Sequence, residues 1–390
     1  MNTRVMITTT WRRRQWLFVR LNARRIWNMV LGAWHFARKH ERVSSLPAVL
    51  KIDISPICNL SCTVCVHADP NGNDALERQV FAPGHKMSVE QYRKIIDQVR
   101  GRTATVSLYT WGDPMTHPDL DEMCRIAAEA GLQVHISTNF SFGLKDDRIR
   151  SIVESGLTHL TVCVDGLSQE KYQRTRVGGR IDRVLHNLRR VLETRRRLGL
   201  DFPKVEVQYI KFQHNLDEVE PARKLADEMG VDQFTEFWGA LHNYADREPE
   251  HYATVAPRKN RALPQCYWPH FSMVIKYNGD VIPCCEHRMA AQHMKGGDAR
   301  VFGNVFQTGV AEVWNSEEYR KARRIVSNPE VVEAQPELRR HFCDGCFVIF
   351  DTEIAKTARW ANDHRWEELF EMDERGRPRR KPREVTGLPA

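Results

Sequence analysis

The chain has 390 residues, 42% of them hydrophobic, which is enough to bury the core of one large domain or two medium ones. Ten cysteines in so long a chain do not indicate a secreted disulfide scaffold, and eight of them fall in two sets near glycine and proline, which favours metal binding in a reducing compartment. The net charge of +8 sits at the two ends, because residues 1–46 hold ten Lys or Arg against one acid, so we expect no nucleic-acid partner for the acidic body.

The first segment, residues 1–46, is predicted to form a basic amphipathic helix over 11–39. It has no run of about 18 uncharged apolar residues, and its recurring arginines argue against a cleavable signal peptide. Such a helix suits an anionic membrane surface, but it also suits packing on the protein's own body with its arginines solvated. We expect a cytoplasmic protein, peripheral on the inner face of the membrane under the first alternative. The apolar face at 100° per residue consists of Phe18, Val19, Ile26, Trp27, Val30, Ala33, Trp34 and Ala37.

Strands and helices alternate through the body of the chain, residues 47–255. This alternation indicates parallel βαβ units in an open or closed barrel, an α/β fold with its chemistry at the carboxyl ends of the strands. The expected strands cover 48–55, 103–109, 133–137, 159–164, 205–210 and 233–237. The expected helices cover 88–100, 119–130, 146–155, 181–198 and 216–229, with Ser88 as the N-cap of the first.

Three cysteines, Cys58, Cys62 and Cys65, follow the first expected strand at spacings of three and two intervening residues. Three thiolates on one loop can hold three irons of a cubane cluster and leave the fourth iron open to a small molecule. The same thiolates suit zinc, for which His67 is a local fourth ligand. The spacing favours the cluster.

A second cysteine set lies downstream, around a hairpin expected to turn at 277–280. Four thiolates there fit either a closed zinc site or a second cubane, and the spacing does not choose between them. Cys285 is interpreted as a buried neighbour of the set, with a spare ligand as the alternative, and Cys124 and Cys163 as core residues. The four expected ligands are Cys266, Cys284, Cys343 and Cys346.

The first cysteine loop resembles the Cys-x3-Cys-x2-Cys signature of the radical S-adenosylmethionine (radical SAM) superfamily, which implies a partial six-stranded TIM-like barrel. The loop at 111–114 resembles the superfamily's Gly-Gly-Glu-Pro loop after the second strand, whose backbone and acidic residue hold the cofactor's amino group. Two polar residues match positions after the third and fourth strands. The resemblance therefore implies that S-adenosylmethionine is contacted by Trp111, Gly112, Asp113, Pro114, Asn139 and Asp165.

The second set, with the patterns at 303–305 and 313–317, resembles the auxiliary-cluster extension called SPASM or its shorter twitch form. Because the larger form has seven cysteines and two auxiliary clusters, four cysteines imply one auxiliary 4Fe-4S cluster in a domain over 256–350. Residues 351–390 are expected to form a helix over 353–370 and then a basic, disordered tail over 375–383.

The resemblance implies reductive cleavage of S-adenosylmethionine to a 5′-deoxyadenosyl radical, hydrogen abstraction, and oxidation or cross-linking of the substrate with one electron passing to the auxiliary cluster. It also implies reduced flavodoxin or ferredoxin as the electron donor. No peptide-recognition domain precedes the barrel, and together with the basic helix this favours a membrane-associated glycan or lipid substrate. The alternatives are a ribosomal peptide substrate and, from another class, a zinc-stabilised, membrane-tethered binding protein. The sequence does not identify an acid or base residue.

Overall fold

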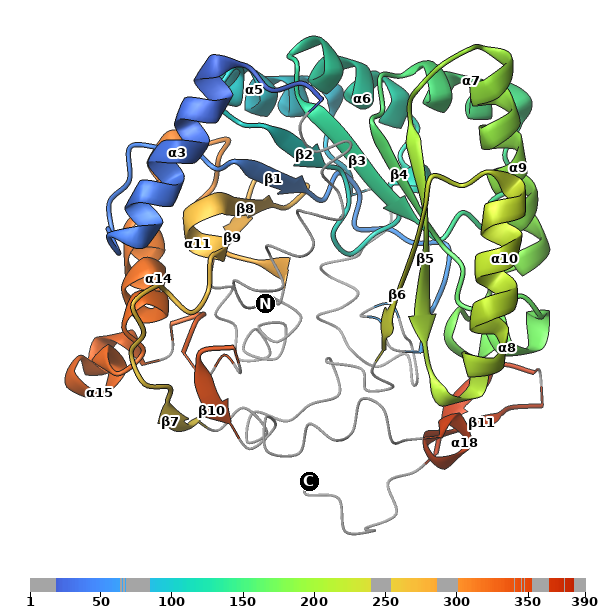
Figure 1. Cartoon of the computed structure of the whole chain (residues 1–390). Helices are drawn as coiled ribbons and strands as arrows, with labels where there is room; N and C mark the ends of the chain where they lie inside the picture. Colours follow the sequence, from blue (N-terminus) through green and yellow to red (C-terminus); the bar gives the residue numbers. More distant parts are fainter. Residues whose placement is uncertain are drawn as a thin grey trace.

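A curved eight-stranded sheet forms the centre of the molecule, with its strands in the order β6-β5-β4-β3-β2-β1-β8-β9 (Figure 1). The first six strands run parallel and in chain order, which confirms the predicted partial barrel. The computed structural model describes residues 19–63, 65, 67, 85–239, 254–285, 301–339, 341–344, 346, 348–352, 365–374 and 376–381. The six strands are β1 (Val49–Ile52), β2 (Thr105–Ser107), β3 (Gln133–Thr138), β4 (His159–Cys163), β5 (Lys204–Lys211) and β6 (Gln233–Trp238).

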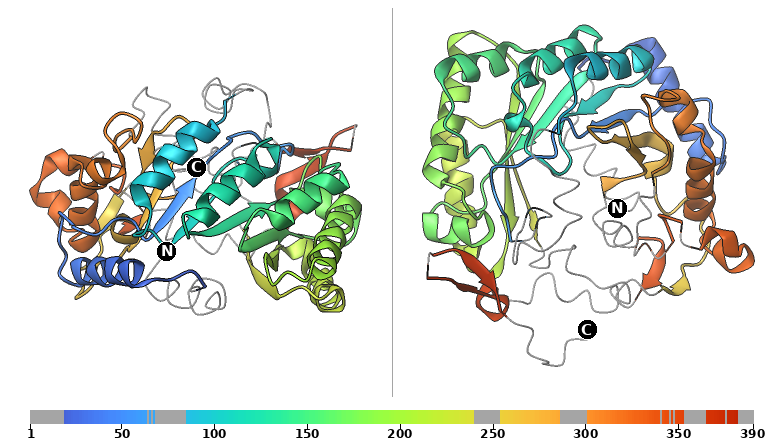
Figure 2. Two further views of the ribbon diagram at one scale, coloured as in Figure 1. Left: turned by 90° about the horizontal axis from the view of Figure 1, so that it is seen from above. Right: turned by 180° about the vertical axis from the view of Figure 1, so that it is seen from behind.

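Helices cover the convex face of this sheet (Figures 1 and 2). Ser88 begins the first of them as predicted: its hydroxyl accepts the backbone N–H of Gln91, whose side chain accepts the N–H of Ser88 in return. Helix α8 was not predicted. The helices are α5 (Val89–Val99), α6 (Leu120–Glu129), α7 (Asp146–Glu154), α8 (Gln169–Thr175), α9 (Ile181–Arg197) and α10 (Val219–Met229).

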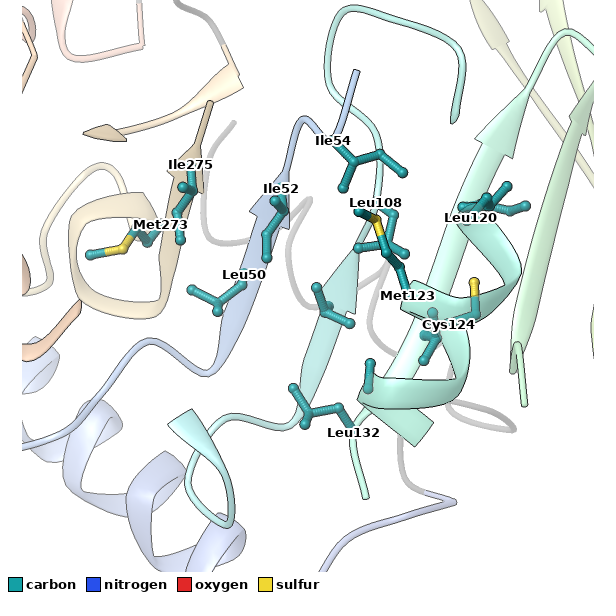
Figure 3. Close-up of a cluster of buried hydrophobic side chains, with 14 of the residues drawn as sticks. Leu50, Ile52, Ile54, Leu108, Leu120, Met123, Cys124, Leu132, Met273 and Ile275 are labelled. Carbon is teal, nitrogen blue, oxygen red and sulfur yellow. The ribbon is translucent and has the colours of Figure 1, made fainter. Parts of the chain in front are cut away.

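The two faces of the strands differ in character. Positions such as Leu50 and Ile52 on β1 pack with Met123 of α6 in the main hydrophobic core, part of which is shown in Figure 3. The alternate positions point to the concave face because side chains alternate along a strand, and several of these are buried and polar. They include Ser107, His135, Thr161 and Glu206.

The predicted hairpin forms from β8 (Ser272–Ile275) and β9 (Val281–Ile282), with Gly279 at φ 86° in its turn. The strand with which this hairpin pairs was not predicted. β8 pairs in parallel with β1, Val49 opposite Ser272, so the hairpin continues the barrel sheet. The second cysteine set is thereby brought beside the strand that leads into the first.

Several described elements of the 254–352 region meet at one buried arginine, Arg323 of α14 (Glu317–Ser327). Its guanidinium donates to the carbonyl oxygens of Glu41, Pro269 and Trp314 at 2.7–2.8 Å. It therefore joins the amino-terminal segment, α11 (Trp268–Phe271) and α13 (Val310–Trp314). The remaining elements are α15 (Val331–Ala334) and the pair β7 (Thr254–Pro257) with β10 (Phe350–Thr352).

The amino-terminal helix is shorter than predicted. α3 covers Ala23–Ala37 and begins at Asn22, whose side chain accepts the N–H of Arg25. Residues 19–22 are not helical, so a continuous helix over 11–39 is wrong at that point, and residues 11–18 lie outside the described part. In the portion of the chain that the structure describes, none of the helices has the length and apolar character needed to cross a membrane.

The carboxyl-terminal prediction also needs correction. Residues 353–364 of the expected helix lie outside the described part, and the remainder is only α18 (Trp366–Leu369). β11 (Phe370–Met372) and β12 (Pro378–Arg380) then form a hairpin where helix and tail disorder were expected. The reason is packing: Trp366 and Phe370 bury their rings with Phe212, and Trp366 donates its indole N–H to the carbonyl of Arg174.

Replacing Arg323 tests its role in joining these segments. Arg323→Met should lower the free energy of unfolding by about 3 kcal/mol, because three carbonyls, two of them in buried hydrogen bonds, lose their donor. Anaerobic urea unfolding would measure the change. Arg320→Met, an exposed arginine on the same helix, is the matched control and should leave stability nearly unchanged.

Candidate functional site

The first cysteine loop follows β1 and is held by α8 and the turn after it. The backbone N–H groups of Ser61 and Thr63 donate to the carbonyls of Val177 and Thr175, each at 3.1 Å. Cys62 is buried, and Cys58 and Cys65 are half-buried. The three thiols lie close enough to act on one another electrostatically, and burial raises the pKa of the Cys62 thiol to about 12, although the charge of Arg176 opposes this.

The loop after β2 is fitted directly onto the cysteine loop. The buried carboxylate of Asp53 accepts the N–H groups of Trp111 and Gly112 at 3.3 and 3.4 Å, and the N–H of Asp113 donates to the carbonyl of Ile57 at 2.9 Å. A Cβ atom on Gly112 would lie 1.9 Å from the carbonyl oxygen of Ser55. Only glycine allows this approach.

Asp113 and Asn139 join the end of β3 to the same place. The Asp113 carboxylate accepts the hydroxyl of Thr138 at 2.9 Å and both the backbone and side-chain N–H groups of Asn139 at 2.7 Å. Burial raises the pKa of Asp113 to about 6, against the effect of these hydrogen bonds. The Asn139 amide nitrogen also lies 3.7 Å from the sulfur of Cys58. The ends of β1, β2 and β3 therefore meet at Cys58.

Asp165, after β4, is bound to an arginine that the sequence analysis missed. Its carboxylate accepts Arg176 Nε at 2.5 Å and the N–H of Ile210 at 2.9 Å. An Nη atom of Arg176 lies 4.0 Å from the sulfur of Cys62, so its positive charge is next to the cysteine loop. Ser168, which caps α8, was a signal for the helix, but nothing in the sequence separates Arg176 from the other arginines.

The second cysteine set gathers across the hairpin. Cys343 is buried, and Cys346 and Cys266 are near enough to contribute to the raised pKa of its thiol, after burial itself. Burial raises the pKa of Tyr319, and the nearby thiols of Cys284 and Cys343 add to this rise. The four predicted ligands therefore lie in one region of the fold. Cys285 is half-buried in an apolar cluster beside them.

Trp111 belongs to an apolar cluster that contacts both cysteine sets. This small buried cluster includes Tyr267 and Trp268, and one cysteine of the first set and three of the second pack against it: Cys65, Cys266, Cys284 and Cys285. Its carbonyl lies 3.2 Å from His67 Nε2, the imidazole that a local zinc site would need.

The donor sets suit iron–sulfur clusters, which are held mainly by cysteine thiolates. All seven predicted ligands are cysteines, and Arg176 supplies a countercharge beside one of them. Among the described residues, no three His, Cys, Asp or Glu side chains form a group that could hold a single metal ion.

Two family models match the chain. The radical SAM superfamily model matches residues 52–235, and the model of the iron–sulfur cluster-binding domain SPASM matches residues 266–347. The chain belongs to the radical SAM superfamily. A radical SAM domain binds a 4Fe-4S cluster and S-adenosylmethionine, and a SPASM domain binds auxiliary iron–sulfur clusters, so this radical SAM chain is an enzyme and the zinc-stabilised binding protein is not supported.

The proteins that are similar to this chain are named for different reactions. The AdoMet-dependent heme synthase of Methanosarcina barkeri is 25% identical over 48% of this chain and 50% of its own length. The GTP 3′,8-cyclase of Aquifex aeolicus is 31% identical over 34% of this chain and 40% of its own. The chain therefore spans half or less of these relatives. The PqqA peptide cyclase of Rhodopseudomonas palustris is 24% identical over 70% of this chain and 74% of its own.

SuiB from Streptococcus suis is similar in structure, with a TM-score of 0.53 and 16% identity over 74% of this chain and 70% of that one. At this identity the likeness shows the fold alone.

Gly112→Ala tests the contact between the two loops. We expect the rate of S-adenosylmethionine cleavage to fall by about 100-fold, because the added methyl group separates the loop after β2 from the cysteine loop. Release of 5′-deoxyadenosine under reducing, anaerobic conditions measures it. Gly143→Ala is the control, since a Cβ there meets nothing within 4 Å; equal loss in both variants would contradict the prediction.

Proposed function

We propose that this radical SAM enzyme oxidises or cross-links a polar substrate, with one auxiliary 4Fe-4S cluster close to the cluster that binds S-adenosylmethionine. The observation that carries the proposal is that one buried apolar cluster, which includes Trp111, is in contact with cysteines of both sets. When bound, the two clusters and S-adenosylmethionine supply one-electron chemistry: a hydrogen-abstracting radical and a site that takes up the electron left on the substrate.

The proposal assigns the first cluster to Cys58, Cys62 and Cys65 in a barrel domain over 47–255. It assigns the auxiliary cluster to a domain over 256–350, whose ligands are Cys266, Cys284, Cys343 and Cys346. The contacts to S-adenosylmethionine are assigned to Trp111, Gly112, Asp113, Pro114, Asn139 and Asp165. The electron donor, a reduced flavodoxin or ferredoxin, is proposed from the superfamily resemblance.

The chain's own residues position this chemistry. Asp53 and Asp113 hold the loops that carry the proposed contacts, and Arg176 offsets negative charge at Cys62. Apolar side chains around Trp111 exclude water from the region between the cysteine sets.

The concave face of the sheet supports a polar substrate. Ser137 of β3 and Gln208 of β5 lie on this face toward the carboxyl ends of their strands and are only half-buried, and each has an oxygen 3.8 Å from the sulfur of Cys163. Such hydrogen-bonding side chains suit hydroxyl or amide groups better than hydrocarbon. We therefore propose the glycan part of a membrane-associated compound as the substrate, with the membrane association argued below from α3.

A ribosomal peptide is the second candidate. It is favoured by the similarity to PqqA peptide cyclase over 74% of that protein, and by SuiB, which has been solved bound to its precursor peptide SuiA. The polar concave face accommodates amides as well as hydroxyls.

Cysteine substitutions test the proposed clusters. Reconstituted anaerobic protein should hold about eight irons, from two 4Fe-4S clusters. Cys58→Ala should abolish S-adenosylmethionine cleavage, whereas Cys343→Ala should lower iron to about four per chain and retain cleavage. Iron assay and 5′-deoxyadenosine release measure both. Cys124→Ala, in the hydrophobic core, should keep full iron; cleavage by Cys58→Ala would reject the mechanism.

The two substrate candidates are separated by supplying the reduced enzyme with fractionated cell extract. A lipid-linked glycan fraction should raise 5′-deoxyadenosine release above the substrate-free rate, and a peptide fraction should not. The reverse result would establish the peptide candidate instead.

A further inference from the structure

The outward face of α3 is apolar. It consists of Ala23, Ile26, Trp27, Val30, Ala33, Trp34 and Ala37, all exposed, and we call it the α3 apolar face. Trp27 is 62% exposed and Trp34 51%, more than other large apolar side chains in the described part of the chain. A helix on a protein surface normally turns such a face inward. Here it is exposed, on a helix that lies at the edge of the molecule (Figure 2).

The opposite side of α3 binds the body, through the buried ring of Phe36 and through polar side chains. Buried Arg25 donates to the carbonyls of Thr103 and Ala130 at 3.0 and 2.8 Å. Asn28 exchanges two hydrogen bonds with the backbone of Leu46, at 2.8 and 2.9 Å. Turning the helix to bury its tryptophans would break these bonds and leave buried polar groups without partners. The exposure is therefore fixed by the protein's own contacts.

Positive charge borders the α3 apolar face. Arg24, Arg38 and Arg42 are exposed, and no ion pair joins any of them to an acid among the described residues. Glu41 is the one acidic residue in 1–46, and both its oxygens bind Arg324 at 2.8 and 2.7 Å. Residues 1–18, which precede the face along the chain, add four arginines and no acid.

We propose that the α3 apolar face docks on a membrane surface that contains anionic lipids, with α3 lying in the headgroup region. Tryptophans suit that region, and each arginine near it gains from the negative surface. A second copy of this chain fits less well, because a symmetric contact would bring two strongly basic segments together. The proposal goes beyond the proposed function and does not depend on it, since vesicle binding requires no cofactor chemistry.

Docking through α3 also orients the enzyme. Arg20 and Arg25 bind carbonyls at Leu132, Thr103 and Ala130, in loops that precede β2 and β3. The first cysteine loop and the loop after β2 lie at the opposite ends of their strands. The other end of α3 is nearer the site, because its Phe36 belongs to the apolar cluster of Trp111. The bilayer therefore lies beside the barrel along α3.

Sedimentation of the full-length holoenzyme with vesicles tests the proposal. We expect binding to vesicles of phosphatidylcholine and phosphatidylglycerol at about two to one, and much less to phosphatidylcholine alone. Trp27→Ser/Trp34→Ser should lower the partition coefficient by at least about tenfold. Arg24→Ala and Arg38→Ala should each lower it by about fivefold, with anionic vesicles only.

Trp238→Ser is the matched control, because Trp238 is 40% exposed on β6, at the far end of the sheet. It should bind vesicles like the wild type, and melting temperatures of all variants should agree. The proposal is overturned if the wild type sediments equally with both vesicle types or if the double tryptophan variant binds like the control. It is also overturned if ultracentrifugation without vesicles shows a dimer that the double variant abolishes.

Discussion

The candidate site depends on the buried carboxylate of Asp53. It accepts the backbone N–H groups of Trp111 and Gly112, and burial raises its pKa to about 7 against the effect of those bonds. This contact fixes the loop after β2 against the backbone that carries the first three cysteines. The neighbouring Asp113 then fixes the end of β3. One short strand end thus sets the relative position of three loops, and this is why the site can be rigid although it is built mainly from loops.

Much of the barrel could be predicted from local sequence signals. Apolar runs marked each of the six parallel strands, Ser88 marked a helix start, and Gly279 marked the hairpin turn. The residues proposed to hold clusters were found by their spacing along the chain. These signals are local, and they were sufficient to predict the helices, strands and motifs.

Contacts between distant segments could not be predicted in the same way. Nothing local shows that Ser272 pairs beside Val49, that Arg176 reaches Asp165, or that Arg323 binds the carbonyl of Glu41. The carboxyl-terminal hairpin was missed because its stability comes from the burial of Trp366 against Phe212, far away in sequence. Tertiary packing overrides propensity in such short segments.

The α3 helix shows a further limit of periodicity. Its pattern correctly separated an apolar face from a polar one, but a pattern cannot say which face the rest of the protein covers. Arg25 and Asn28 decide this, because backbone carbonyls and amides elsewhere in the fold are placed to pair with them. This amphipathic helix is attached to the body by its hydrogen-bonding side, so its apolar face stays exposed.

The apolar cluster around Trp111 would affect the reduction potentials of the bound iron–sulfur clusters. Low-dielectric surroundings screen charge poorly, so clusters held by the two cysteine sets that contact it would each respond to the other's oxidation state. Reduction of one cluster would lower the reduction potential of the other. Solvent would otherwise screen this effect. The apolar cluster of Trp111 would thus couple the two reduction potentials, and a substitution at position 111 would change both.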